Sequence, residues 1–324
     1  MDLKNFRFGG IQSSNHASPS TTHTLARSLR ATEDASLGAL ALLVGCWKGT
    51  GFNQIWRPVH GAGAQDRFLE LNQTTETLQF EEIPGEIPNR GLLQADINMR
   101  GLHYLQQIND AVALSPDGQP VGLHLEPGVW LSVPLTTNPN EPATVARLAT
   151  IPHGSSITLQ GTSQVSVGGP EIGAADITPF VIDKPGQKIP FPESNLATPS
   201  AFRTAASDIP AVTQAMVDDP NTALRNALTG QKISSTVTMQ LSTSIAQVAP
   251  PSCGGGTADT AFLAGTPAAG PNARAAQVDA VFWIETVEGP AGTQLQLQYT
   301  QRVLLNFNGL SWPHISVATL IKQP

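Results

Sequence analysis

Residues 43–53 read Leu-Val-Gly-Cys-Trp-Lys-Gly-Thr-Gly-Phe-Asn, and this stretch indicates the fold class. It follows residues 32–43, where alanine and leucine recur at a roughly helical period and Thr32 is the expected N-cap. The glycines of the stretch allow a strand to bend sharply, and Trp47 is large enough to close one end of a barrel interior. We therefore expect a helix that leads into the first strand of a β-barrel.

Strand-like segments continue to the end of the chain, separated by turn signals such as Asp117-Gly118 and Asn308-Gly309. Short turns between many strands are typical of consecutive antiparallel neighbours. The predicted fold class is mainly β, with a single antiparallel, calycin-like β-barrel of about ten strands; two packed sheets, as in a jelly roll, are the alternative. The predicted strands are residues 46–56, 67–80, 102–108, 121–133, 143–151, 155–167, 234–245, 278–287, 293–307 and 310–321.

Four segments differ in composition, and they define the expected domain organisation. Residues 1–30 are rich in serine, threonine and histidine and are expected to be irregular, whereas residues 31–324 form the barrel domain. Residues 168–232 are partly helical and are expected as an insertion that caps or flanks one mouth of the barrel. Residues 250–272 are rich in glycine, alanine and proline, which predicts a flexible loop.

Composition excludes several classes of function. The 324-residue chain carries a formal net charge of −7 and has no lysine or arginine cluster, so we expect no nucleic-acid partner. It has no apolar run long enough for a membrane span, and residues 1–20 lack the apolar core of a secretory signal, so a cytoplasmic location is expected. Cys46 and Cys253 could pair, but a buried thiol is the simpler interpretation for Cys46.

Two histidines lie where a ligand could reach them. In the predicted strand 310–321, a period of two places Trp312, His314, Ser316 and Ala318 on one face, which leaves room beside the imidazole for a flat molecule. His153 lies at a predicted turn, and turns at the mouth of a barrel often contact ligands. The alternative for His314 is a histidine that is hydrogen-bonded within the barrel wall.

The order of a helix, Gly-x-Trp-x-Gly-x-Gly and many strands resembles the opening of the calycin superfamily, especially the nitrobindin-like haem-binding barrels. The resemblance covers residues 37–80 and 278–322. It implies a barrel that holds haem or another hydrophobic small molecule, with the proximal histidine on a late strand. His314 is the only histidine after His153, so the resemblance implies that His314 binds the haem iron. Trp312, His153 and Trp47 are the other residues expected to contact the cofactor.

Carboxylates suggest a second kind of function. His124 and Glu126 share one face of a predicted strand, and such a pair can serve as base and acid. Glu285 shares a face with Trp283; inside an apolar barrel its pKa would be raised, which would make it a general acid. The alternative for each is an outward, solvated face.

Three functions follow from these residues. The first is binding of a hydrophobic small molecule, above all haem, with gas-binding or peroxide-type chemistry. The second is a cofactor-free isomerase or cyclase that acts on a hydrophobic metabolite through His124, Glu126 and Glu285. The third is a carrier of a lipid-like molecule without catalysis. The oligomeric state cannot be predicted from the sequence.

Overall fold

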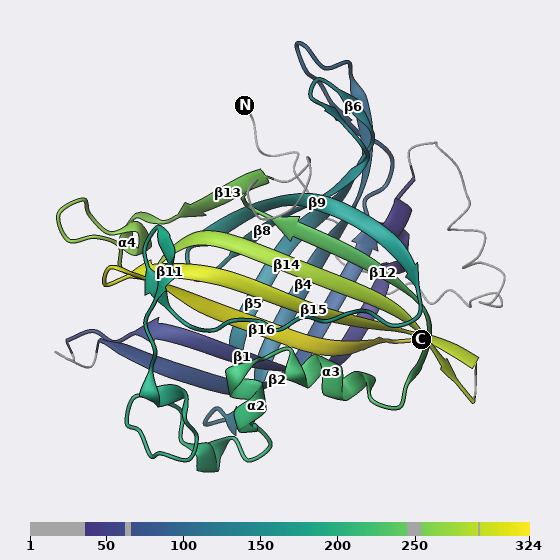
Figure 1. The fold of residues 1–324 in the computed structure, drawn as a ribbon. Coiled ribbons are helices and arrows are strands. Elements are labelled where there is room, and N and C mark those ends of the chain that lie inside the picture. The colour runs from purple at the N-terminus through teal and green to yellow at the C-terminus, as the bar shows by residue number, and fades with distance from the viewer. Residues whose placement is uncertain (1–35, 62–65, 245–253, 291) are drawn as a thin grey trace. The chain divides into compact units, whose positions relative to one another are not determined.

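A closed ring of ten antiparallel strands forms the body of the protein (Figure 1). The computed structural model describes residues 36–61, 66–244, 254–290 and 292–324. In order around the ring, the strands are β1 (Gly45–Pro58), β2 (Arg67–Glu82), β4 (Ile97–Leu114), β5 (Pro120–Val133), β8 (Thr144–Ile151), β9 (Ser155–Val167), β12 (Lys232–Ser242), β14 (Arg274–Gly289), β15 (Gly292–Phe307) and β16 (Leu310–Lys322).

The ring closes where β1 pairs with β16. Eight residue pairs join the two strands, from Trp47 with Lys322 to Gln54 with Ile315. Because this pairing leaves no gap between the first and last strands, the barrel prediction is confirmed and the jelly-roll alternative is wrong.

The glycines of β1 allow the neighbouring strand to come close. A Cβ atom on Gly49 would lie 2.0 Å from the carbonyl oxygen of Thr319, and a Cβ atom on Gly51 would lie 2.7 Å from Glu76 Oε1. A side chain at either position would therefore collide with β16 or with a buried carboxylate. The Gly-x-Gly of the opening stretch thus serves tight strand pairing and leaves space for Glu76.

Trp47 closes one end of the barrel, as predicted. Its indole Nε1 donates a hydrogen bond to the carbonyl of Leu43 at 2.7 Å. Leu43 follows the 3₁₀ helix η2 (Gly38–Leu42), whose Leu40 is also fully buried. These side chains belong to an apolar cluster that fills this end of the interior, together with residues such as Phe80, Trp130 and Phe282. The described part of the predicted helix is therefore one short 3₁₀ helix that completes a plug.

The insertion covers the outer wall of the barrel. It contains β10 (Phe180–Val181), β11 (Lys184–Lys188), η3 (Pro192–Ser194), η4 (Ala206–Asp208), α2 (Gln214–Asp218) and α3 (Thr222–Leu228). Val217 and Leu224 of the helices share a second apolar cluster with Phe52 and Val317, which point outward from the barrel. In Figure 1, α2 and α3 lie beside β1 and β16. Of the two expected arrangements, the insertion therefore flanks the barrel.

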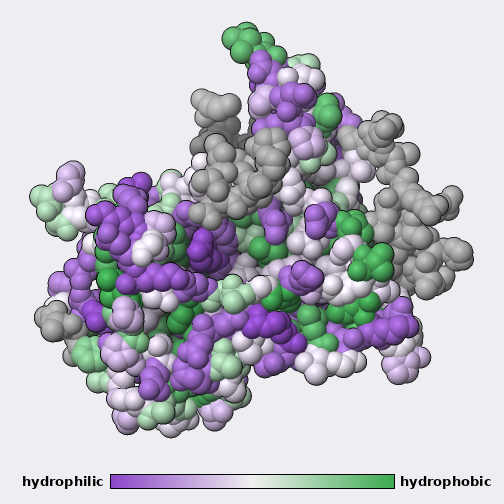
Figure 2. All heavy atoms as spheres, in the orientation of Figure 1, coloured by the Kyte–Doolittle hydropathy of each residue, from purple (hydrophilic) through white to green (hydrophobic). Residues whose placement is uncertain are grey.

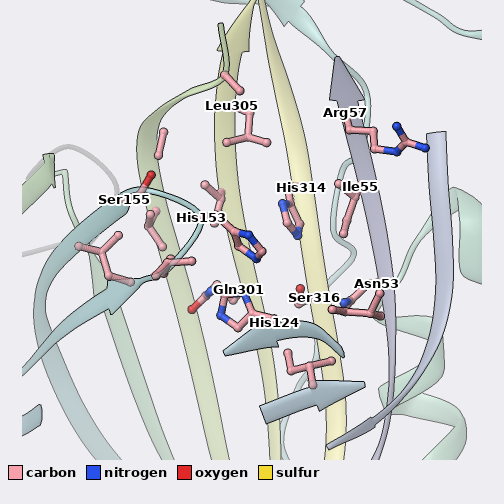
Figure 3. A pocket seen from close by; sticks show the side chains of 18 of the residues that line it. Asn53, Ile55, Arg57, His124, His153, Ser155, Gln301, Leu305, His314 and Ser316 are labelled. Carbon is pink, nitrogen blue, oxygen red and sulfur yellow. The ribbon is translucent and has the colours of Figure 1, made fainter. Parts of the chain in front are cut away.

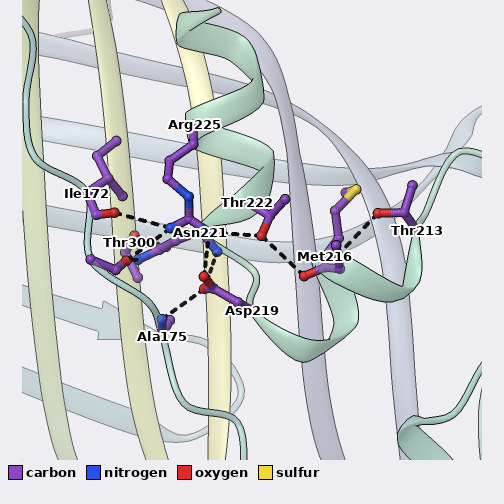
Figure 4. A network of polar contacts seen from close by, with 11 residues as sticks. Ile172, Ala175, Thr213, Met216, Asp219, Asn221, Thr222, Arg225 and Thr300 are labelled. Carbon is purple, nitrogen blue, oxygen red and sulfur yellow. Dashed lines mark hydrogen bonds and ion pairs between the residues drawn. The ribbon is translucent and has the colours of Figure 1, made fainter.

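A polar network fastens the insertion to the barrel (Figure 4). Thr300 of β15 donates a hydrogen bond to Asn221 Oδ1 at 2.5 Å, and Asn221 Nδ2 donates to the carbonyl of Gly173 at 2.8 Å. Arg225 pairs with Asp219 at 2.5 Å and also donates to the carbonyl of Ile172. One buried asparagine thus joins the barrel wall, the loop before β10 and the start of α3.

The segment expected as a flexible loop contains regular structure. In its described part, β13 (Gly254–Asp259) pairs with the first half of β9, and α4 (Ala261–Ala264) follows. The glycines permit this pairing because a Cβ atom on Gly255 would lie 1.9 Å from the carbonyl oxygen of Thr158. Cys253 lies outside the described residues, and Cys46 is a free, half-buried thiol.

The remaining strands are short. They are β3 (Ile87–Asn89), β6 (Thr136–Thr137) and β7 (Asn140–Glu141).

The visible surface is mostly polar (Figure 2). Figure 2 shows hydrophilic side chains over much of the visible face, with small apolar patches between them. No helix in the described ranges is long and apolar enough to cross a membrane.

Candidate functional site

A cavity of about 350 Å³ occupies the end of the barrel away from the Trp47 plug (Figure 3). Its volume is in the range of small-molecule sites. Apolar side chains form most of its wall, among them Ile55, Ile108, Leu123, Ile151, Ile157, Val278, Val303 and Leu305. The polar residues that line it include Asn53, Gln106, His124, His153, Tyr299, Gln301, His314 and Ser316.

Three histidines meet at this cavity. His314 comes from β16, His124 from β5, and His153 from the turn between β8 and β9. The His124 and His153 rings have centroids 5.8 Å apart. Along the ring, β1, β2 and β4 lie between β16 and β5. His124 and His153 therefore approach the cavity from the wall opposite His314. The fold thus brings together three histidines that lie far apart in the sequence.

His314 presents a neutral imidazole to the cavity. Burial lowers its pKa to about 3, and repulsion from His124 and His153 acts in the same direction. The ring makes no hydrogen bond within the described residues, and Figure 3 shows it pointing into the cavity. A neutral, unpartnered imidazole has a nitrogen lone pair available for a ligand.

Trp312 lies outside the cavity, in contrast to the period-two prediction. Pairing between β1 and β16 ends at Gln54 and Ile315, and β10 pairs with β16 beyond that point. Trp312 enters the outer apolar cluster there, stacking on Phe307 with ring centroids 4.7 Å apart and lying 5.2 Å from the Phe191 ring. Trp47 does not line the cavity either, because it belongs to the plug at the other end.

His124 faces the cavity in phase with the inward residues Glu126 and Trp130 of β5, and a β-bulge adds Leu123 to the lining. Ile108 of β4 pairs with His124, but the next residue, Asn109, pairs with Gly122, so Leu123 is left without an opposite partner. Leu123 and His124 therefore both line the cavity, whereas Leu125 is exposed outside. His124 and Glu126 continue the inward alternation of Trp130 and Gly128, so the pair does not lie on an outward, solvated face.

Glu126 is fully buried and is held as a carboxylate. It accepts hydrogen bonds from Tyr104 and Arg147 through Oε1, while Oε2 lies 3.2 Å from His124 Nε2. Burial by itself would raise the pKa of Glu126, but the Arg147 charge and the hydrogen bonds from His124 and Tyr104 outweigh it and lower the pKa to about 2. Arg147 also donates to Gln301 Oε1 at 2.6 Å.

A second buried carboxylate lies nearby. Tyr299 donates to Glu76 Oε2 at 2.6 Å, Thr74 donates to Oε1 at 2.9 Å, and Gln106 donates to the Tyr299 hydroxyl at 3.0 Å. Burial raises the pKa of Glu76 to about 7 despite these hydrogen bonds. Tyr299 and Gln106 line the cavity, so Glu76 stands directly behind its wall.

Glu285 does not lie inside the barrel. The interior residues of β14 near it are Phe282 and Ile284, so Glu285 points to the outer side with Trp283. It is fully buried there, between Thr236 of β12 and Gln296 of β15. Burial raises its pKa to about 8, as expected, but the carboxyl cannot act on a molecule in the cavity.

The other histidines that the structure describes lie outside the cavity. His103 is half exposed and lies 3.3 Å from Glu81 on the outside of the barrel, and His60 is exposed. Among the residues that the structure describes, no three histidine, cysteine, aspartate or glutamate side chains are grouped to hold a metal ion.

The fold and the cavity together define a closed, ten-stranded antiparallel barrel with a histidine-lined interior site. No protein-family model matches the chain, and no curated protein matches it. Among solved structures, the crystal structure of Rv2717c from M. tuberculosis is similar, with a TM-score of 0.41 and 14% sequence identity. The similarity covers 91% of this chain and 100% of that chain.

Proposed function

We propose that the barrel binds a hydrophobic small molecule in the cavity, and that this molecule is haem with His314 as the axial ligand of its iron. The position of His314 carries the proposal: a neutral imidazole without a hydrogen-bond partner among the described residues faces a mainly apolar space of about 350 Å³. A single protein imidazole is a sufficient axial ligand, because the porphyrin supplies the remaining nitrogens.

The residues around the cavity fit such a cofactor. Ile55, Val303 and Leu305 offer apolar contacts near His314, and Arg57 is the cationic side chain among the described residues that line the cavity. Arg57 is half exposed and pairs with Glu70 at 2.6 Å, so an acidic group at the edge of a ligand would share Arg57 with this carboxylate. When bound, haem supplies gas-binding or peroxide-type chemistry.

Hemin titration followed by absorption spectroscopy tests this function. We expect wild-type protein to take up one equivalent of hemin with a sharpened Soret band, and His314→Ala to lose at least about tenfold in affinity, since a metal–imidazole bond is removed. His103→Ala is the matched control, because His103 lies outside the barrel. Absence of uptake by wild-type protein, or equal uptake by His314→Ala, would contradict the proposal.

A second candidate function is supported by the inward position of His124. A cofactor-free isomerase or cyclase needs a proton-transfer group beside an apolar substrate, and His124 occupies such a position. Colourless protein that takes up no hemin but binds an apolar molecule would favour this candidate. If substitution of the cavity histidines then left ligand binding unchanged, a carrier without catalysis would be the better description.

A further inference from the structure

The interior of this barrel contains an ion pair that packing does not require. Glu126 and Arg147 are both fully buried, and Val145 and Ala149 flank Arg147 on the same face of β8. Removing two charges from water is costly, and well-packed apolar residues in their place are often equally stable or more so. The Glu126–Arg147 ion pair is therefore better explained by its effect on the protonation of a neighbouring side chain.

That neighbour is His124. Arg147 and Tyr104 occupy Oε1 of Glu126, which leaves Oε2 for His124 Nε2 at 3.2 Å. An ionised carboxylate can only accept, so it holds the ring proton on Nε2 and leaves Nδ1 as an acceptor. The His124 side chain is 17% exposed, and it lines the cavity.

Asn53 adds a second polar group to this wall. Asn53 of β1 is 2% exposed and lines the cavity, and its Oδ1 is buried without a hydrogen-bond partner among the described residues. Because that oxygen is inaccessible, the acceptor open to a ligand is Nδ1 of His124. A free acceptor in a mainly apolar space favours a ligand that carries a hydrogen-bond donor.

We propose that His124 accepts a proton from a weakly acidic hydroxyl, as in a phenol or an enol, of an apolar molecule bound in the cavity, with Glu126 and Arg147 as positioning residues. The O–H bond of the ligand breaks, its electron pair stays on oxygen, and the proton moves to Nδ1. The resulting imidazolium is stabilised by the Glu126 carboxylate. The inference rests on the proposed binding of an apolar molecule in the cavity, but it does not require haem.

The photoacid 2-naphthol is a suitable probe, because its excited state transfers a proton to a nearby base and then emits as naphtholate. With protein in excess, binding is measured by fluorescence anisotropy and proton transfer by the ratio of naphtholate to naphthol emission. We expect wild-type protein to give strong naphtholate emission. In His124→Gln the ratio should fall about tenfold or more while anisotropy still reports binding, because the base is lost and the cavity is kept. His103→Gln should behave as wild type.

The two readouts separate this inference from the proposed function. Binding with an unchanged emission ratio in His124→Gln would overturn the role of His124 but leave the binding cavity in place. Absence of 2-naphthol binding to wild-type protein would count against the cavity as an apolar-ligand site and against the inference that rests on it.

The tautomer of His124 gives a test that needs no ligand. Long-range ¹H–¹⁵N correlation spectra of the free protein, recorded above the usual imidazole pKa of about 6.5, report which ring nitrogen is protonated. We expect His124 to carry its proton on Nε2, and Glu126→Gln to lose this preference. A proton on Nδ1 in wild-type protein would overturn the inference. Because Glu126→Gln leaves Arg147 unpaired and could unfold, the wild-type spectrum alone decides the point.

Discussion

Glu76 and Arg147 show which signals in single residues point to the site. Arg147 lies on a strand face that is otherwise apolar, with Val145 and Ala149, whereas Glu76 shares its face with Leu78 and Phe80 but also with Thr74. A charged residue in phase with an inward apolar pattern is unusual and marks a buried polar group. Applied to β8, this rule identifies Arg147 from the sequence, although the predicted site included neither residue.

Leu123 and Trp312 show where strict alternation fails. A bulge brings Leu123 to the cavity beside His124, and the end of β1–β16 pairing changes the surroundings of Trp312. Both features depend on the partner strand, so alternation within one strand cannot reveal them. For Glu285, alternation could not decide which of two half-apolar faces points inward, since the insertion buries the outer face as well.

Glu285 leads to a prediction about pH and stability. Burial raises its pKa to about 8 from 4.5, so the folded state binds a proton that the unfolded state releases between these values. By linkage, the free energy of unfolding falls as pH rises through this window. Glu285→Gln cannot lose the proton, so it should be more stable than wild type by on the order of 3 kcal/mol at neutral pH, and equal to it below about pH 4.5.

Urea unfolding at several pH values measures this effect. The difference in unfolding free energy between Glu285→Gln and wild type isolates this group from Glu76, whose raised pKa gives the same sign. Glu82→Gln is the control, because Glu82 is exposed. If the difference in unfolding free energy between Glu285→Gln and wild type stays constant from pH 4.5 to 8, the folded state does not hold Glu285 as a protonated carboxyl.

At the scale of elements, the sequence predicted the strands well and the insertion only in outline. Strand segments were found because alternation and turn residues are local signals, and Asn308-Gly309 does form the tight turn between β15 and β16. The position of the insertion depends on contacts of Asn221 and Leu224 with strands far along the chain. Such long-range contacts leave no mark in the local pattern.

Asn221 gives a prediction for the insertion. Asn221→Ala removes the hydrogen bonds to Thr300 and Gly173 and leaves the half-buried Thr300 hydroxyl without its acceptor, whereas the Gly173 carbonyl keeps Arg225, so the variant should destabilise the insertion by about 1 kcal/mol. Hydrogen exchange should quicken in α2 and α3 but not in the barrel strands. Asn226→Ala, at an exposed position of the same helix, is the matched control. Equal exchange in the two variants would mean that Asn221 does not fasten the insertion.

At the scale of the whole molecule, the barrel has a packed end and an open end. The apolar cluster around Trp47 fills the first, and the histidine-lined cavity occupies the second. A polar layer that includes Glu76, Glu126 and Arg147 lies within the interior next to the cavity. The sequence predicted the ten strands and three of the cavity residues, His124, His153 and His314. The predicted site included Glu126 but not Glu76 or Arg147, because only the closed barrel brings these side chains of β2, β5 and β8 together.

The most direct test is whether the small-molecule ligand binds in the cavity inside the barrel. Ser316 lines the cavity and pairs with Asn53 across β1 and β16, so Ser316→Phe places a ring in the space that the ligand needs. We predict that this variant remains folded and loses binding of both hemin and 2-naphthol by at least about tenfold, whereas Ser163→Phe, at an exposed position of β9, binds as wild type. Wild-type affinity in a folded Ser316→Phe protein would contradict the claim that this cavity is the binding site.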